Sequence, residues 1–273
     1  MFYFRNDNPL GPINLQTGLK YARGVYVKWL DDDDLMNPGC VESLVRVMEA
    51  FPEVALATTA RDPIGPDGQV ITDLANLYEP IFPQNFLARG SDILRACLTG
   101  AIPVKGTFNP LGEPSCALVR RSQIPDSPFQ LSADNGKGLL FDFVLYLRIL
   151  QNSLIFYCYE KFVKYRRHQA NTDKISPLLP NLAPAWFLMS LHAKANGLFG
   201  RDEEAQIALE HGLTRFEEFI NDYGSRMPNE DLARLREWHS HWRGKYQRPS
   251  LIKPTPLKSA RGFVLELPSQ SIP

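Results

Sequence analysis

Four consecutive aspartates, Asp31 to Asp34, directly follow the apolar stretch Val25–Leu30. Adjacent carboxylates repel one another, and packing them beside a core strand is costly unless a cation is present. Mg²⁺ or Mn²⁺ is commonly held by one or two protein carboxylates together with the phosphates of a substrate. An acidic run is also typical of a solvated surface turn. The flanking sequence favours the cation, because a surface turn requires neither a strand before it nor a capped helix after it.

The elements around the aspartates are predicted from the apolar pattern. The run Val25–Leu30 suits a strand that is buried on both faces of a parallel sheet. Asn37 is a candidate helix N-cap and Pro38 a first helical residue, for a helix that reaches about Ala50. The aspartates therefore lie between a strand and a helix, at the edge where open α/β sheets bind ligands.

Within the acidic run, an extended backbone would separate the side chains into two pairs. Side chains alternate along a strand, so Asp31 and Asp33 are expected on one face, with Asp32 and Asp34 on the other.

Asp142 is a second carboxylate in an unusual setting, since it lies in the apolar run Leu139–Arg148. This run predicts a helix over residues 138–151. One interpretation is a helix-capping aspartate. The other is a partly desolvated general base that accepts a proton from a hydroxyl. The residue types alone leave both open.

His168 follows a predicted strand in the basic segment Tyr165–His168. A single histidine is commonly a polar loop residue. Alternatively, it completes the aspartate site as a metal ligand, with Arg166 and Arg167 near a phosphate. The segment Gly112–Ser115 predicts a rigid loop that could line a pocket.

The composition limits the class of protein. The chain has 273 residues, 44% of them hydrophobic, and its 30 basic and 30 acidic residues balance. Nothing therefore suggests bulk electrostatic attraction to nucleic acid or to a membrane. Four scattered cysteines predict reduced thiols in a cytoplasmic protein. Neither a transmembrane segment nor a secretory signal is apparent, and peripheral attachment to the inner face of a membrane stays open.

Three regions are expected along the chain. An α/β domain occupies residues 1–175, a helical appendage 176–247, and an extended or disordered tail 248–273. Further strands are predicted at Val54–Thr59, Cys116–Arg120 and Ser153–Tyr159, with a hairpin arm at Val70–Ile71. Further helices are predicted at 15–22, at 91–98 with Ser91 as the cap, and at 184–196, 201–219 and 229–246.

Several of these segments together resemble the inverting glycosyltransferases of family 2, which have the GT-A fold. The motifs follow the family's order over about the first 175 residues. The matching segments are Asn14 with Ala22–Val27, Leu30–Leu35 with Pro38, Asp67–Gly68, Asn109–Ser115 with Arg120–Arg121, Asp142–Arg148 and Tyr165–His168.

The resemblance implies a fold and a donor site. The fold would be a GT-A-like, Rossmann-like mixed sheet flanked by helices. Asp31 and Asp33 match the Asp-x-Asp element that binds a nucleotide diphosphate through Mn²⁺ or Mg²⁺. Asp32 and Asn14 would contact the nucleotide sugar, for which a UDP-sugar is expected. His168 matches a histidine that is a further metal ligand in some members.

The resemblance also implies a reaction. Asp142 matches the catalytic base that activates an acceptor hydroxyl. The acceptor would be a saccharide or a lipid-linked molecule, and the product a polysaccharide or glycoconjugate.

The chain departs from the family pattern at its start. Family members open with a strand and a Pro-Thr-Tyr-Asn-like loop, whereas Met1 comes just before the Asn14 segment. The strand at Val25–Leu30 is therefore expected to expose one edge. Phe141 also replaces a residue that is often acidic in relatives. A truncated, non-catalytic GT-A remnant that binds a partner protein is the alternative function, and a simple cation-binding module ranks third.

Overall fold

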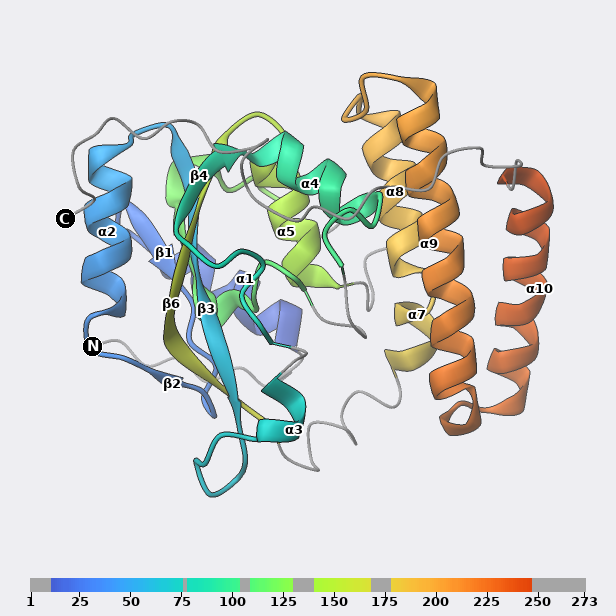
Figure 1. Cartoon of the computed structure of the whole chain (residues 1–273), viewed down its shortest axis with the longest axis horizontal. Coiled ribbons are helices and arrows are strands. Elements are labelled where there is room, and N and C mark those ends of the chain that lie inside the picture. Colours follow the sequence, from blue (N-terminus) through green and yellow to red (C-terminus); the bar gives the residue numbers. More distant parts are fainter. Residues whose placement is uncertain (1–10, 76–77, 104–108, 130–139, 168–177, 247–273) are drawn as a thin grey trace.

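A mixed β-sheet forms the centre of the computed structural model, which describes residues 11–75, 78–103, 109–129, 140–167 and 178–246. The strand order is β1 (Tyr26–Lys28), β5 (Ala117–Arg120), β3 (Val54–Ile64), β6 (Leu154–Arg166) and β2 (Leu35–Met36), and β4 (Phe86–Arg89) also pairs with β6 (Figure 1). Among the strands of the described residues, β3 and β6 are the only parallel neighbours, and the other pairs are antiparallel. The predicted α/β class, with a mixed sheet flanked by helices, is confirmed.

The two central strands are longer than the sequence predicts. β3 spans Val54–Ile64 and β6 spans Leu154–Arg166, whereas the predictions ended at Thr59 and Tyr159. Their second halves contain charged residues that obscure the strand pattern. Two of these charges pair across the strands, since Lys161 of β6 forms an ion pair with Asp62 of β3 at 2.6 Å.

The strand before the aspartates differs from its prediction. β1 covers only Tyr26–Lys28 and is antiparallel to β5, which spans Ala117–Arg120. Val27 and Trp29 are buried, whereas 64% of Val25 is exposed. The prediction of a parallel strand buried on both faces is therefore wrong, because the apolar run hides an alternation of inward and outward side chains. Among the described residues β1 is paired on one side only, as expected of an edge.

Helices cover both faces of the sheet (Figure 1). On one face lies α2 (Cys40–Ala50), which packs Cys40, Leu44 and Met48 against the sheet. The other face is covered by α4 (Gly90–Leu98) and α5 (Phe141–Leu150), and α1 (Gly11–Tyr21) packs against the same core. Short elements complete this part: β2 (Leu35–Met36), α3 (Thr72–Ala75) and β4 (Phe86–Arg89).

Two predicted helix caps are wrong. Asn37 Oδ1 accepts a hydrogen bond from Gly39 N at 2.9 Å, so Asn37 closes a turn and α2 begins at Cys40 rather than at Pro38. The N-cap of α4 is Arg89, and Ser91 lies inside the helix.

The predicted helical appendage contains α7 (Leu179–Leu182), α8 (Ala185–Ala195), α9 (Asp202–Tyr223) and α10 (Asn229–Tyr246). α8 joins it to the core, since the rings of Trp186 and Phe143 lie 4.9 Å apart. α8 and α9 approach closely at Gly212, where a Cβ atom would lie 2.6 Å from Phe187 Cα. The predicted boundary near residue 175 and the predicted tail lie outside the described residues and stay predictions.

The cysteines agree with the prediction of unpaired thiols, since all four are free and buried. Within the described ranges, no helix has both the length and the apolar character needed to cross a bilayer.

Candidate active site

The four aspartates form a tight turn, here called the acidic turn (residues 31–34). Asp34 N–H donates to Asp31 O at 3.2 Å, which places Asp32 and Asp33 at the centre of the turn. Asp32 is exposed, Asp31 and Asp33 are half-buried, and Asp34 is buried. The predicted alternation of faces is therefore wrong, because the chain must reverse here between β1 and β2.

The acidic turn lies at the carboxyl end of the parallel strands, as predicted. Arg166, the last residue of β6, holds it there. Its main-chain N–H donates to Asp34 Oδ1 at 2.9 Å and its Nε to Asp33 O at 2.7 Å. Its Nη1 also donates to Gly65 O at 2.8 Å, just after β3 ends. The described hydrogen bonds of this guanidinium thus go to main-chain oxygens, whereas the sequence suggested a phosphate.

A second set of contacts joins the turn to a neighbouring loop. Asp31 N–H donates to Ser115 Oγ at 3.0 Å. Lys28 Nζ donates to Ser115 O and, at 3.0 Å, to Trp29 O. Burial lowers the pKa of Lys28, and the charges of Asp34 and Asp31 act in the opposite direction. Lys28 therefore places a half-buried amino group beside the turn, which the sequence analysis did not identify.

Asp31 has too little positive charge around it. Burial raises its pKa to about 7, and repulsion from Asp34, Asp33, Glu113 and Asp32 adds to this effect. Hard oxygen ligands with excess negative charge suit Mg²⁺ or Mn²⁺. The described part of the chain contains no group of three or more histidine, cysteine or acidic side chains able to hold a metal alone. A cation at the turn would therefore need further ligands, such as the phosphates of a substrate.

Asp142 is the second residue of α5 and is 8% exposed. Its Oδ1 accepts a hydrogen bond from Phe143 N at 2.8 Å, but the N-cap position belongs to Leu140. Burial raises its pKa to about 6, and the charge of Glu113 contributes; Phe143 N–H, the Asn109 side chain and Arg61 oppose the increase. Such a carboxyl can exchange protons near neutral pH, which suits a general base.

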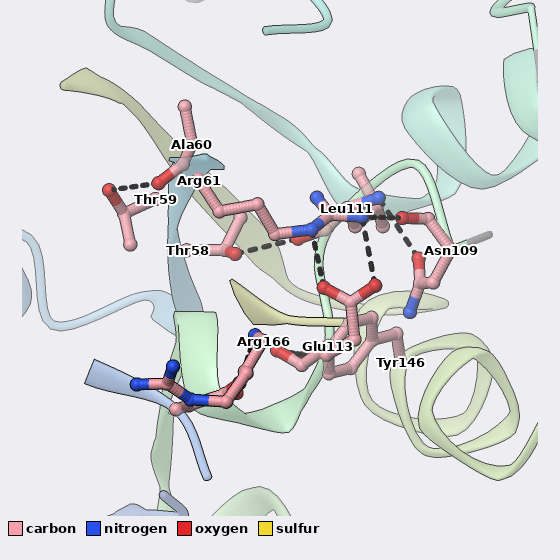
Figure 2. Close-up of polar contacts among 10 residues, drawn as sticks. Thr58, Thr59, Ala60, Arg61, Asn109, Leu111, Glu113, Tyr146 and Arg166 are labelled. Atoms are coloured by element: carbon pink, nitrogen blue, oxygen red, sulfur yellow. Dashed lines mark hydrogen bonds and ion pairs between the residues drawn. The ribbon is translucent and has the colours of Figure 1, made fainter. Parts of the chain in front are cut away.

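A buried ion pair that the sequence analysis missed lies between these groups. Arg61 of β3 pairs through Nε and Nη2 with both carboxylate oxygens of Glu113, and Nη2 to Oε1 measures 3.1 Å (Figure 2). Arg61 Nη2 also donates to Asn109 O at 3.1 Å, and its guanidinium lies 5.0 Å from the centre of the Tyr78 ring. The sequence signal was a charged residue following an apolar strand.

Glu113 belongs to the segment Asn109–Cys116, here called the Glu113 loop. Thr58 Oγ1 donates to Leu111 O at 2.6 Å, and Leu111 N–H donates to Asn109 Oδ1 at 2.9 Å. Gly112 has φ +94°, and a Cβ atom there would lie 2.8 Å from Cys116 Cβ. Only glycine suits this conformation, so the structure agrees with the predicted rigid loop.

Glu113 acts electrostatically on Asp31, Asp34 and Asp142, so its charge affects both the acidic turn and Asp142.

Two predicted site residues remain, Asn14 and His168. Asn14 is exposed on α1, next to Leu15, whose carbonyl accepts a hydrogen bond from Trp29 Nε1 at 3.4 Å. His168 lies outside the described residues, and its role as a ligand stays a prediction.

A cavity of about 500 Å³ opens at the opposite end of the sheet, where β3 and β6 begin. Arg89, Arg120 and Gln151 are among its lining residues, which include none of the predicted site residues. The cavity is therefore separate from the acidic turn.

Residues 1–102 match the model of the family described as Glycosyl transferase family 2. This part of the chain is similar to the family 2 glycosyltransferases. This confirms the resemblance to that family, and the matched region includes the acidic turn and Arg61 but ends before Glu113 and Asp142.

No curated protein matches the chain. Among solved structures, the chain is similar to S. aureus TarS 1–349, with 14% identity and a TM-score of 0.49. The match covers 83% of this chain and 61% of that one, so this chain spans about three-fifths of the solved structure's length.

Burial of Asp142 should appear in the pH dependence of stability. Its pKa rises from 3.8 to about 6 on folding. The folded protein then holds the proton of Asp142 more tightly than the unfolded chain does. The contribution of this protonated carboxyl to stability is therefore present at low pH and is lost as pH rises from about 4 to about 6. An increase of this size in the pKa corresponds to about 3 kcal/mol in the free energy of unfolding. Asp142→Asn should therefore gain stability relative to the parent between pH 4.5 and pH 7.5, as measured by urea unfolding.

The matched control is Asp222→Asn, on the exposed surface of α9. Equal pH dependence of the Asp142 and Asp222 variants would contradict the assignment of a perturbed carboxyl to Asp142.

Proposed function

We propose that the chain is an inverting glycosyltransferase that moves a sugar from a nucleotide-diphosphate donor to an acceptor hydroxyl, assisted by a divalent cation. The reaction would serve the synthesis of a polysaccharide or glycoconjugate. The observation that carries the proposal is the shared position of two acidic elements. Glu113 acts electrostatically on both Asp31 and the buried Asp142, and the Glu113 loop contacts the acidic turn through Ser115 and α5 through Tyr146.

In this proposal the acidic turn holds the donor. Asp31 and Asp33 bind Mg²⁺ or Mn²⁺ together with the diphosphate of a UDP-sugar, and His168 is the further ligand expected from the family resemblance. Asp32 and Asn14 contact the nucleotide sugar. When bound, the cation would neutralise the negative charge that develops on the leaving diphosphate.

Asp142 acts on the acceptor. Its carboxylate takes the proton of an acceptor hydroxyl while that oxygen forms a bond to the anomeric carbon. The bond from this carbon to the diphosphate oxygen breaks on the opposite face, so the configuration at the anomeric carbon is inverted. With a pKa of about 6, Asp142 is ionised at neutral pH and still able to accept a proton. The acceptor would be a saccharide or a lipid-linked molecule.

A second candidate function is a GT-A-like module that binds a partner protein and does not catalyse. The observation in its favour is that β1 is paired on one side only among the described residues. The retained acidic turn and the perturbed Asp142 favour the enzyme.

Calorimetric titration with UDP distinguishes the two. The parent should bind UDP only when Mn²⁺ is present, and Asp31→Asn should weaken this binding at least tenfold, because a carboxylate ligand is lost. Asp142→Asn should leave binding within about twofold, since Asp142 is assigned to the acceptor side. The absence of Mn²⁺-dependent heat in the parent would favour the non-catalytic module.

Turnover gives a separate test. With Mn²⁺ and a panel of UDP-sugars, release of UDP should fall by a factor of about 10² to 10⁴ in Asp142→Asn, the range typical of general-base removal. Arg148→Gln, six residues further along α5, provides the control. If Asp142→Asn lost both UDP binding and turnover, Asp142 would be a structural residue instead.

A further inference from the structure

The Arg61–Glu113 ion pair is enclosed at the candidate site. The side chains are 7% and 14% exposed, and Arg61 engages both oxygens of Glu113. Burying an ion pair is rarely the most stable solution, because apolar residues of similar volume commonly do as well or better. The pair therefore calls for an explanation other than stability.

One end of the Glu113 loop reaches the helix that carries Asp142. Tyr146 lies one turn beyond Asp142 on α5, and its hydroxyl donates to Glu113 O at 3.3 Å (Figure 2). Arg61 also binds Asn109 O, and the Asn109 side chain in turn favours the charged form of Asp142.

The other end of the loop reaches the acidic turn. Ser115, two residues after Glu113, accepts the hydrogen bond from Asp31 N–H and the bond from Lys28 Nζ. The loop is thus a short physical bridge between the two groups of acids, and the charge of Arg61 anchors it to β3.

The two members of the pair act on Asp142 in opposite directions. Of the charged groups near this carboxyl, Glu113 raises its pKa and Arg61 lowers it. Tyr146 also faces Asp142, which raises the pKa of the tyrosine hydroxyl after the larger effect of burial.

We propose that Arg61 and Glu113 are a positioning pair for the transfer reaction. They hold the Glu113 loop between the acidic turn and α5, and their opposite charges set how strongly Asp142 holds its proton. The inference rests on the proposed function in one respect: it takes Asp142 to be the base.

The test is an NMR titration of side-chain carboxyls in protein labelled with ¹³C-aspartate, with the Asp142 signal identified by its loss in Asp142→Asn. Glu113→Gln should move the Asp142 titration to lower pH by about one unit, and Arg61→Gln should move it to higher pH by a similar amount. The double variant should return to within about half a unit of the parent. Shifts in the same direction, or none, would overturn the proposal.

A second readout follows the position of the loop. Amide exchange at Asp31 N–H, which is bonded to Ser115 Oγ, should be at least tenfold faster in the double variant, because the anchor to β3 is lost. The double variant carries this test even where a single variant leaves a buried charge unpaired and does not fold. Parent-like exchange at Asp31 in the folded double variant would contradict the positioning role.

The matched control is Asp62→Asn with Lys161→Gln. It removes a more exposed ion pair between β3 and β6, one residue from Arg61, and should change neither readout. Neither measurement needs a substrate. If the titrations behave as expected and no sugar transfer is found, the proposed function fails alone. If transfer depends on Asp142 and the opposite shifts are missing, only this inference fails.

Discussion

The buried ion pair between Arg61 and Glu113 is the contact on which the candidate site depends. It connects the central strand β3 to a loop that touches the acidic turn through Ser115 and α5 through the Glu113 carbonyl. A charge pair is more demanding than an apolar contact here, since either partner alone would leave an unpaired charge in the protein interior. The same feature fixes the geometry closely, because both oxygens of Glu113 are engaged.

The site combines this pair with carboxylates that oppose one another. Burial, together with repulsion from neighbouring carboxylates, raises the pKa of Asp31 and of Asp142, so each destabilises the folded chain when ionised. Lys28 and the main-chain contacts of Arg166 offset part of this cost without neutralising the turn. Local instability of this kind is typical of functional sites, where charge that the protein does not neutralise binds a ligand.

Much of the site's outline could be predicted from local sequence. The acidic turn lies at the carboxyl end of the parallel strands, and Asp142 lies at the start of an apolar helix, as the motifs indicated. The predicted conformation of the turn was wrong. Alternating side chains require an extended chain, whereas the polypeptide reverses between β1 and β2. The Arg61–Glu113 pair could not be predicted, since its members lie far apart in sequence and β3 was expected to end before Arg61.

The central claim is that the acidic turn and Asp142 form one site around a bound cation. Paramagnetic Mn²⁺ added with UDP tests this most directly, through the ¹³C carboxyl signal of Asp142. The account predicts that this signal broadens at substoichiometric Mn²⁺ while the signal of Asp222, on α9, stays sharp. A sharp Asp142 signal at saturating Mn²⁺ and UDP would show that the cation binds elsewhere and would contradict the account.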